Sequence, residues 1–153
     1  MPRKHLLIIY HSQSGATRRL AKAVLEGASI EPEVDTRLLQ AMEASLTDLL
    51  WCDAVIFGSP ENLGSLSGAI KDFFDRTFYP AQPYQLNLPY GVFISAGNDG
   101  SGALRQLQAI ARGYPFKAVI DPVIVKGIPD QEGIEQCQKL GATLAAGIGL
   151  GIF

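Results

Sequence analysis

The sequence predicts an α/β fold with three layers, in which a five-stranded parallel sheet carries helices on both faces. Two observations predict it. Continuous apolar runs, typical of strands buried on both faces, alternate from end to end with segments of helical period. Strands that alternate with helices imply βαβ units and therefore a parallel sheet, and right-handed crossovers leave few topologies. Among these we expect the strand order 2-1-3-4-5.

The first part of the chain contains two buried strands, an edge strand and two helices. Residues 5–10 (HLLIIY) form the first apolar run, and the helix after it has apolar or small residues at i, i+3, i+4, i+7 and i+8 from Thr17. Residues 33–39 alternate between polar and apolar side chains, which indicates an exposed edge strand. Residues 53–59 form the second buried strand, and residues 68–78 favour a helix.

The second part continues the alternation. Residues 91–96 form the third buried strand, residues 103–112 a helix, residues 122–126 a short strand and residues 131–146 a last helix. Three prolines make residues 79–89 the one long irregular stretch. Because long loops in compact domains tend to be functional, we interpret this stretch as a candidate lid.

Composition excludes several classes of protein. The chain has 153 residues, 47% of them hydrophobic, which suits one globular domain over residues 1–153. Its net charge of −2 provides no electrostatic footprint for nucleic acid or for an anionic membrane. Two cysteines without a CxxC motif and two histidines argue against a disulfide framework and a zinc site, so we expect no metal. The apolar run near the N-terminus is too short for a signal-peptide core, so we expect a cytoplasmic protein.

Three loops follow the buried strands of the predicted sheet. In open parallel sheets a ligand binds outside the carboxyl ends of the strands, where the strand order reverses, and this places residues 12–17, 60–67 and 96–102 at the site. The first loop (SQSGAT) offers hydroxyls, a glycine and the free N–H groups of a helix start, which together suit a phosphate. An N-cap followed by turn residues is the alternative. Neither GxxxxGK[ST] nor a GxGxxG after the first strand occurs, so this is no nucleoside triphosphate or dinucleotide motif.

The other two loops are polar and rich in glycine. The loop at 60–67 leaves a strong strand. The loop at 96–102 holds several residues suited to positive φ, so that its backbone can approach a flat ligand, with a flexible turn as the alternative. Because all three loops converge on one edge of the sheet, we expect them to share a ligand.

The residues of these loops resemble those of a known superfamily. Residues 12–17 resemble the phosphate loop, roughly [ST]-x-[ST]-G-x-[ST], of the flavodoxin-like superfamily, which binds flavin mononucleotide (FMN). Residues 58–64 and 67–77 are similar to the second flavin loop and the following helix of its reductase branch. That branch includes NAD(P)H-dependent flavin reductases and quinone reductases of the tryptophan-repressor-binding-protein type. The resemblance covers nearly the whole chain.

The resemblance implies that FMN binds noncovalently. It implies a phosphate site made of Ser12, Gln13, Ser14, Gly15, Ala16 and Thr17. It implies a wall along the ring and the ribityl chain made of Pro60, Glu61, Asn62, Leu63 and Gly64. The polar edge of the ring would be wrapped by Ser95, Ala96, Gly97, Asn98, Asp99 and Gly100. Arg18 and Arg19 lie on the helix after the first loop, and we interpret them as solvated charges, with long-range electrostatic help to the phosphate as the alternative.

The sequence departs from the family pattern in its second loop. Glu61 and Asn62 stand where the quinone reductases carry a threonine and an aromatic residue. Glu61 is open to three interpretations: a solvated acid, a brace, or a charge that lowers the flavin potential. Trp51 precedes its strand, and neither 60–67 nor 96–102 contains the aromatic residues that sandwich the ring in electron-carrier flavodoxins. An open ring face suits hydride transfer from a nicotinamide.

The resemblance therefore implies an oxidoreductase that passes hydride from NAD(P)H through FMN to a quinone, a free flavin or a similar small acceptor. A flavodoxin-type electron carrier and a flavodoxin-fold binding module are the alternatives. The sequence shows no GxSxG elbow and no carboxylate pair, so no catalytic residue is assigned. This does not count against an enzyme, because flavin itself carries the redox chemistry. The apolar tail at 145–153 and the aromatic residues at 78–84 favour a dimer or a tetramer.

Overall fold

The computed structural model of the chain describes residues 2–153. Its sheet consists of β1 (Lys4–Tyr10), β2 (Val34–Gln40), β3 (Ala54–Asn62), β4 (Ser65–Leu66), β5 (Leu88–Ala96), β6 (Phe116–Ala118) and β7 (Val123–Lys126). The order along the sheet is β2-β1-β3-β5-β6, and β7 also pairs with β5. Short β4 turns back on the end of β3 as an antiparallel hairpin, and all other pairings are parallel. If the antiparallel β4 is left out, and β6 and β7 are counted as one strand position beside β5, the order is the predicted 2-1-3-4-5. The α/β fold class is confirmed.

The fifth strand position differs from the prediction because it is divided. Ala118 pairs with Tyr90 and Val123 pairs with Phe93, so four residues of this edge lie opposite only two of β5. The surplus residues bulge outward as the loop 119–122, which contains Pro122. The sequence predicts the second half of this position, residues 122–126, but not β6, which is too short to show a period.

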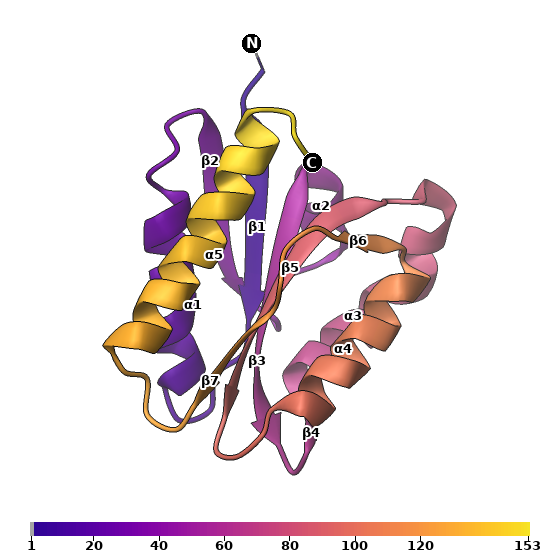
Figure 1. Ribbon diagram of the computed structural model, residues 1–153. Helices are drawn as coiled ribbons and strands as arrows, with labels where there is room; N and C mark the ends of the chain where they lie inside the picture. The colour runs from indigo at the N-terminus through magenta and orange to yellow at the C-terminus, as the bar shows by residue number, and fades with distance from the viewer. Residues whose placement is uncertain (1) are drawn as a thin grey trace.

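Helices cover both faces of the sheet (Figure 1). The helices α1 (Ala16–Ala28) and α5 (Gln131–Gly149) lie on one face, and α2 (Leu46–Trp51), α3 (Gly68–Ala81) and α4 (Ser101–Gly113) lie on the other. Alternate residues of β1 divide between the two cores: Leu6 and Ile8 pack under α1 and α5, and Leu7 and Ile9 pack under α3 and α4. In the described part of the chain, no helix is both long and apolar enough to cross a membrane.

The stretch at 79–89 is neither irregular nor a lid, and that prediction is wrong. Helix α3 continues through Pro80 to Ala81, a 3-10 turn η1 (Gln82–Tyr84) follows, and β5 already begins at Leu88. Tertiary packing outweighs the proline here, because Ala81 is fully buried and Phe78 packs edge-on against Tyr114 with ring centroids 5.2 Å apart. The segment also joins the end of α3 to the start of β5. It therefore lies at the end of the sheet where the parallel strands begin, opposite the predicted ligand loops (Figure 1).

Candidate flavin site

A cavity of about 670 Å³ lies at the carboxyl edge of the sheet, at the bottom of Figure 1. It is lined by Ser14, Gly15, Ala16, Arg19, Pro60, Glu61, Asn62, Ser95, Ala96, Gly97, Gly127, Ile128 and Pro129. These residues come from the ends of β1, β3, β5 and β7 and from the start of α1. The structure thus brings the three loops singled out in the sequence around one space.

Not every residue singled out in the sequence lines that space. Those that do are Ser14, Gly15, Ala16, Pro60, Glu61, Asn62, Ser95, Ala96 and Gly97. Those that lie beside it in the same loops are Ser12, Gln13, Thr17, Leu63, Gly64, Asn98, Asp99 and Gly100. Among the second group, the Ser12 hydroxyl accepts a hydrogen bond from the Gly15 N–H (3.1 Å) and so shapes the first loop. The Thr17 side chain is almost fully buried in the core below α1.

The first turn of α1 is open to an anion. Gly15 begins the helix in the left-handed region (φ 103°), and within residues 2–153 no side chain caps this end. The first intrahelical bond runs from the Arg19 N–H to the Gly15 carbonyl, which leaves the N–H groups of Ala16, Thr17 and Arg18 without helical acceptors. The first turn carries no acidic residue. Donors of this kind at the positive end of a helix fit the phosphate of FMN.

The helices α2, α3 and α5 begin differently. A capping box of Ser45 and Asp48 closes α2, Ser67 caps α3, and Asp130 caps α5. Helix α4 begins at a glycine N-cap, Gly100, and receives its acceptor from another loop. The Glu61 carboxylate accepts hydrogen bonds from the N–H groups of Gly100 (3.0 Å) and Ala103 (3.1 Å).

This geometry assigns Glu61 its role. Of the three interpretations of this residue, the structure supports the brace, because both carboxylate oxygens are engaged with the start of α4. The second and third loops are also in close backbone contact. A Cβ added to Gly102 of α4 would lie 2.1 Å from the Gly64 carbonyl oxygen of the β3–β4 hairpin.

The remaining loops are joined in a similar way. The Asn62 side-chain amide donates to the Gln13 side chain (3.3 Å), which links the first and second loops. The Gly127 N–H donates to the Ala96 carbonyl (2.8 Å), which links the third loop to the segment after β7. Hydrogen bonds therefore connect each wall of the cavity to the next one.

The sequence does not predict the fourth wall, residues 127–129, or the position of Arg19 at the cavity. The segment after β7 carries no recognisable motif, and its one sequence signal is Gly127, which adopts φ 73° in the structure. Arg19 was interpreted as a solvated charge. Its side chain is exposed, yet it lines the cavity beside Gly15 and Ala16, because side chains on a helix tilt toward the helix N-terminus.

Ionisable groups around the cavity are few. The hydroxyl of Ser101 donates to the Asp99 carboxylate, and this bond holds the pKa of Asp99 below its ordinary value. Burial raises the pKa of Cys52 and of Cys137 to about 12, so both thiols are protonated at neutral pH and serve as small apolar core residues. No group of His, Cys, Asp and Glu side chains that could hold a metal ion occurs among the described residues.

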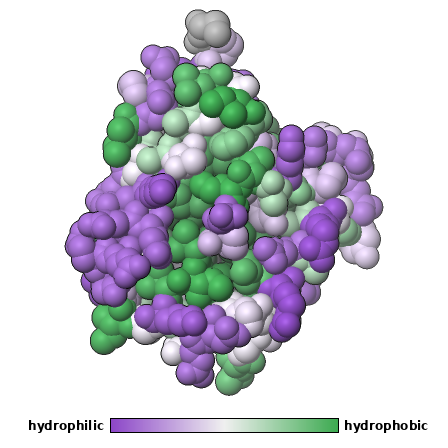
Figure 2. Space-filling view, in the orientation of Figure 1, coloured by the Kyte–Doolittle hydropathy of each residue, from purple (hydrophilic) through white to green (hydrophobic). Residues whose placement is uncertain are grey.

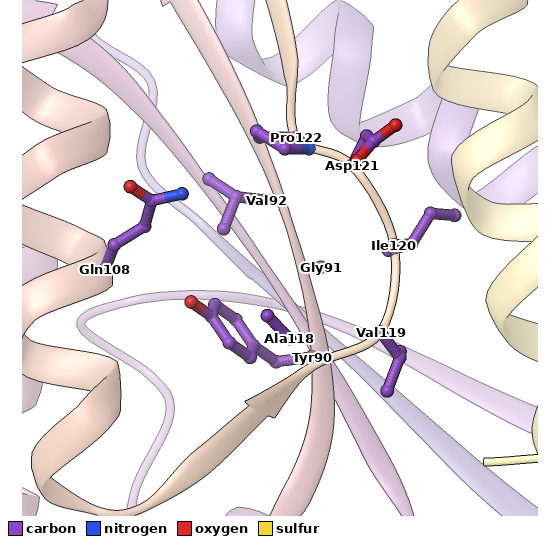
Figure 3. A pocket seen from close by; sticks show the side chains of 9 residues that line it. All are labelled: Tyr90, Gly91, Val92, Gln108, Ala118, Val119, Ile120, Asp121 and Pro122. Carbon is purple, nitrogen blue, oxygen red and sulfur yellow. The ribbon is translucent and has the colours of Figure 1, made fainter.

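A second cavity, of about 540 Å³, lies where the edge strand is interrupted (Figure 3). Figure 3 shows Tyr90 and Gln108 on one side of β5, and Asp121 on the other side with its carboxylate directed away from them. The polar side chains of this cavity do not converge, and it lies away from the carboxyl-edge loops. The cavity between the four loops is therefore the candidate cofactor site.

Comparisons with known proteins indicate the family of the chain. A family model described as NADPH-dependent FMN reductase matches residues 38–125. A flavodoxin of Aquifex aeolicus is 31% identical over 92% of this chain and 84% of its own length. An NAD(P)H dehydrogenase (quinone) of Syntrophus aciditrophicus is 29% identical over 93% of this chain and 84% of its own.

Solved structures show the same fold. A flavodoxin from the domain Archaea superposes with a TM-score of 0.81 at 21% identity and covers 94% of this chain and 98% of its own. The flavodoxin, WrbA-like protein from Agrobacterium tumefaciens superposes with a TM-score of 0.79 at 22% identity, covering 98% of this chain and 99% of its own.

The family model and the similarity to the Aquifex flavodoxin thus identify an FMN-binding protein of the flavodoxin-like superfamily. More narrowly, the chain belongs to the NADPH-dependent FMN reductase family, and it is a flavin-dependent oxidoreductase.

Proposed function

We propose that this chain, acting as one FMN-binding domain over residues 1–153, is an NAD(P)H-dependent reductase. It takes hydride from the nicotinamide through FMN held between the four loops and delivers the electrons to a small acceptor such as a quinone or a free flavin. The observation that carries this proposal is the composition of the cavity wall. Its described lining contains no aromatic side chain, so a flavin ring bound there keeps a face accessible to a second planar molecule.

The residues around the cavity suit successive parts of FMN. The N–H groups at the start of α1 and the Ser14 hydroxyl would hold the phosphate, because charge-assisted donors converge there. Residues 60–64 would lie along the ribityl chain and the ring, and residues 95–100 would face the polar edge of the ring. Ser12, Gln13 and Thr17 would support the phosphate loop from behind. When bound, FMN supplies the redox chemistry, and the protein contributes binding, orientation and electrostatics.

Glu61 serves this function as a positioning residue. It holds the start of α4 against the second loop, so that residues 95–100 keep their distance from residues 60–64. Both of its carboxylate oxygens accept from backbone N–H groups, which fixes the side chain at the wall of the cavity.

An electron carrier is the second candidate, and the similarity to the Aquifex flavodoxin favours it. Such a protein would bind FMN equally well and would need a partner enzyme to reduce it. A flavodoxin-fold module that only binds its ligand is the third. Because the described lining of the cavity contains no aromatic side chain, we favour the reductase over the electron carrier.

Anaerobic stopped-flow mixing with NADPH and with NADH tests the proposal. We expect the FMN-loaded protein to lose its yellow absorbance in a fast phase that saturates with nicotinamide concentration, and a quinone to restore it. If the bound FMN stays oxidised with both nicotinamides but accepts electrons from dithionite, the protein is a carrier and the proposal fails. A protein that takes up no FMN would support the binding module. The same experiment decides between NADPH and NADH.

We further propose that the protein assembles as a dimer or a tetramer. Exposed large apolar side chains include Tyr79 and Tyr84 around the end of α3, and Leu150 and Ile152 at the C-terminus. Exposed groups of this size often mark contact surfaces between subunits.

A further inference from the structure

The most exposed large hydrophobic side chains of the described chain both belong to the flavin-site loops. Leu63 at the tip of the β3–β4 hairpin has a relative exposure of 105%, and Ile128 after β7 has one of 84%. Ile128 lines the cavity. Leu63 lies in the loop already assigned to the ring. Ile128 comes from a segment that neither the sequence motifs nor the family resemblance assigns to the site.

The backbone around Ile128 is held on both sides. Before it, Gly127 adopts a left-handed conformation (φ 73°) and donates its N–H to the Ala96 carbonyl at 2.8 Å. After it, Pro129 is buried, and the Asp130 carboxylate accepts from the Gly133 N–H at 2.8 Å to start α5. The chain thus fixes the backbone of Ile128 and leaves its side chain in solvent at the wall of the cavity.

An aliphatic side chain held in this way suits a flat apolar ligand. Covering Ile128 removes apolar surface from water, and a rigid backbone adds no ordering cost when the contact forms. We propose that Ile128 contacts the ring system of the bound flavin and is an affinity-determining residue of the site. This inference rests on the proposed placement of FMN between the four loops.

Flavin fluorescence provides a direct test. An indole that touches the flavin ring quenches its fluorescence by electron transfer, whereas an aliphatic side chain does not. We expect FMN bound to the Ile128→Trp variant to be several-fold dimmer than FMN bound to the wild type. The control is Ile30→Trp, a change at an isoleucine of similar exposure (76%) in the turn after α1, at the opposite edge of the sheet. That variant should be as bright as the wild type. Equal brightness of the two variants would overturn the proposal.

An affinity measurement gives a second readout. If the fluorescence of FMN bound to the wild type is already quenched, this measurement tests the proposal by itself. Ile128→Ala should weaken FMN and riboflavin by a similar factor, roughly 3- to 30-fold, because the two flavins share the ring. Ile30→Ala should leave both affinities unchanged. Unchanged affinities in Ile128→Ala would refute the ring contact. Neither assay uses a nicotinamide, so failure of this inference and failure of the reductase proposal give separate results.

Discussion

At the residue scale, the site depends on side chains that act between loops. Glu61 accepts from two N–H groups of an element about 40 positions further along the chain. A carboxylate at a helix start is favoured by the helix dipole, and it satisfies donors that would otherwise lack acceptors. This one side chain therefore stabilises α4 and aligns two walls of the cavity.

Replacing Glu61 should affect stability and binding together. We expect Glu61→Ala to lower the free energy of unfolding by about 1–3 kcal/mol, because two donors lose a charged acceptor. FMN and riboflavin should both bind more weakly, since the spacing of the second and third loops is common to both. Glu61→Gln keeps one acceptor oxygen, so its stability and flavin affinity should lie between those of the wild type and those of Glu61→Ala. Urea unfolding and flavin titration measure these effects. The control, Glu33→Ala at an exposed position before β2, should change stability by less than about 0.5 kcal/mol. A loss as small in Glu61→Ala would argue against the brace.

Arg18 and Arg19 provide a matched pair for the phosphate end of the site. Both are exposed on α1, but Arg19 alone of the two lines the cavity. We expect Arg19→Gln to weaken FMN about tenfold at low salt, and less at high salt because the contact is open to screening. Riboflavin, which lacks the phosphate, should bind as it does to the wild type, and Arg18→Gln should leave both affinities unchanged. Isothermal titration with the two flavins makes the comparison. If Arg19→Gln weakened riboflavin as much as FMN, the phosphate assignment would be wrong.

At the element scale, the packing of α1 against α5 depends on two glycines. A Cβ at Gly27 of α1 would lie 1.8 Å from the Gln138 carbonyl oxygen of α5, and a Cβ at Gly141 of α5 would lie 2.0 Å from the Val24 carbonyl oxygen of α1. The two helix backbones touch at this crossing. Because α1 presents the phosphate loop and α5 begins just after Ile128, the crossing also sets the distance between two walls of the cavity.

Adding a methyl group at this crossing should force the helices apart. We expect Gly27→Ala and Gly141→Ala each to cost about 1–3 kcal/mol of unfolding free energy or more, because backbone atoms cannot move aside as side chains do. Gly68→Ala at the start of α3 is the control. No atom lies within 4 Å of its added Cβ, so the change should be neutral or slightly stabilising. Thermal unfolding of the three variants would show the difference. A crossing variant as stable as Gly68→Ala would contradict the close packing.

At the scale of the whole molecule, the exposed surface predicts which regions would make contact in the proposed dimer or tetramer. Figure 2 shows a hydrophobic band over the sheet edge formed by β6 and β7, bordered by hydrophilic side chains. This edge is interrupted by the bulge at 119–122, and Pro122, Lys117 and Lys126 are exposed along it. Bulges, prolines and lysines are the usual protection against pairing of sheet edges. We therefore expect association through the apolar side chains around the end of α3 and at the C-terminus.

Light scattering should report a mass two or four times the 16.5 kDa of the chain at micromolar concentration. Tyr79→Ser and Ile152→Ser each replace one exposed side chain of the two regions. The variant that shifts the equilibrium toward the monomer identifies the region that makes the contact, since each change leaves the core untouched. A wild-type protein that scatters as a monomer would rule out the assembly.

The sequence by itself determined the fold class, the strand order and the three loops that meet at the site. Local sequence patterns predict each of these features. The apolar runs of β1, β3 and β5 identify buried strands, and the residues at 12–17 combine a strand end, hydroxyls and a helix start within six positions. Each pattern lies within one element or at one boundary, where neighbours in sequence are also neighbours in space.

Only the tertiary structure decided the features that depend on contacts between distant residues. Pro80 stays helical because Phe78 packs against Tyr114 and Ala81 is buried, and Glu61 serves as a cap because α4 begins beside it. Ile128 faces the cavity because the Gly127 N–H bonds to the end of β5. The physical reason is the same in each case. A proline, a glutamate or an isoleucine has several stable environments, and the choice among them is made by partners brought near by folding.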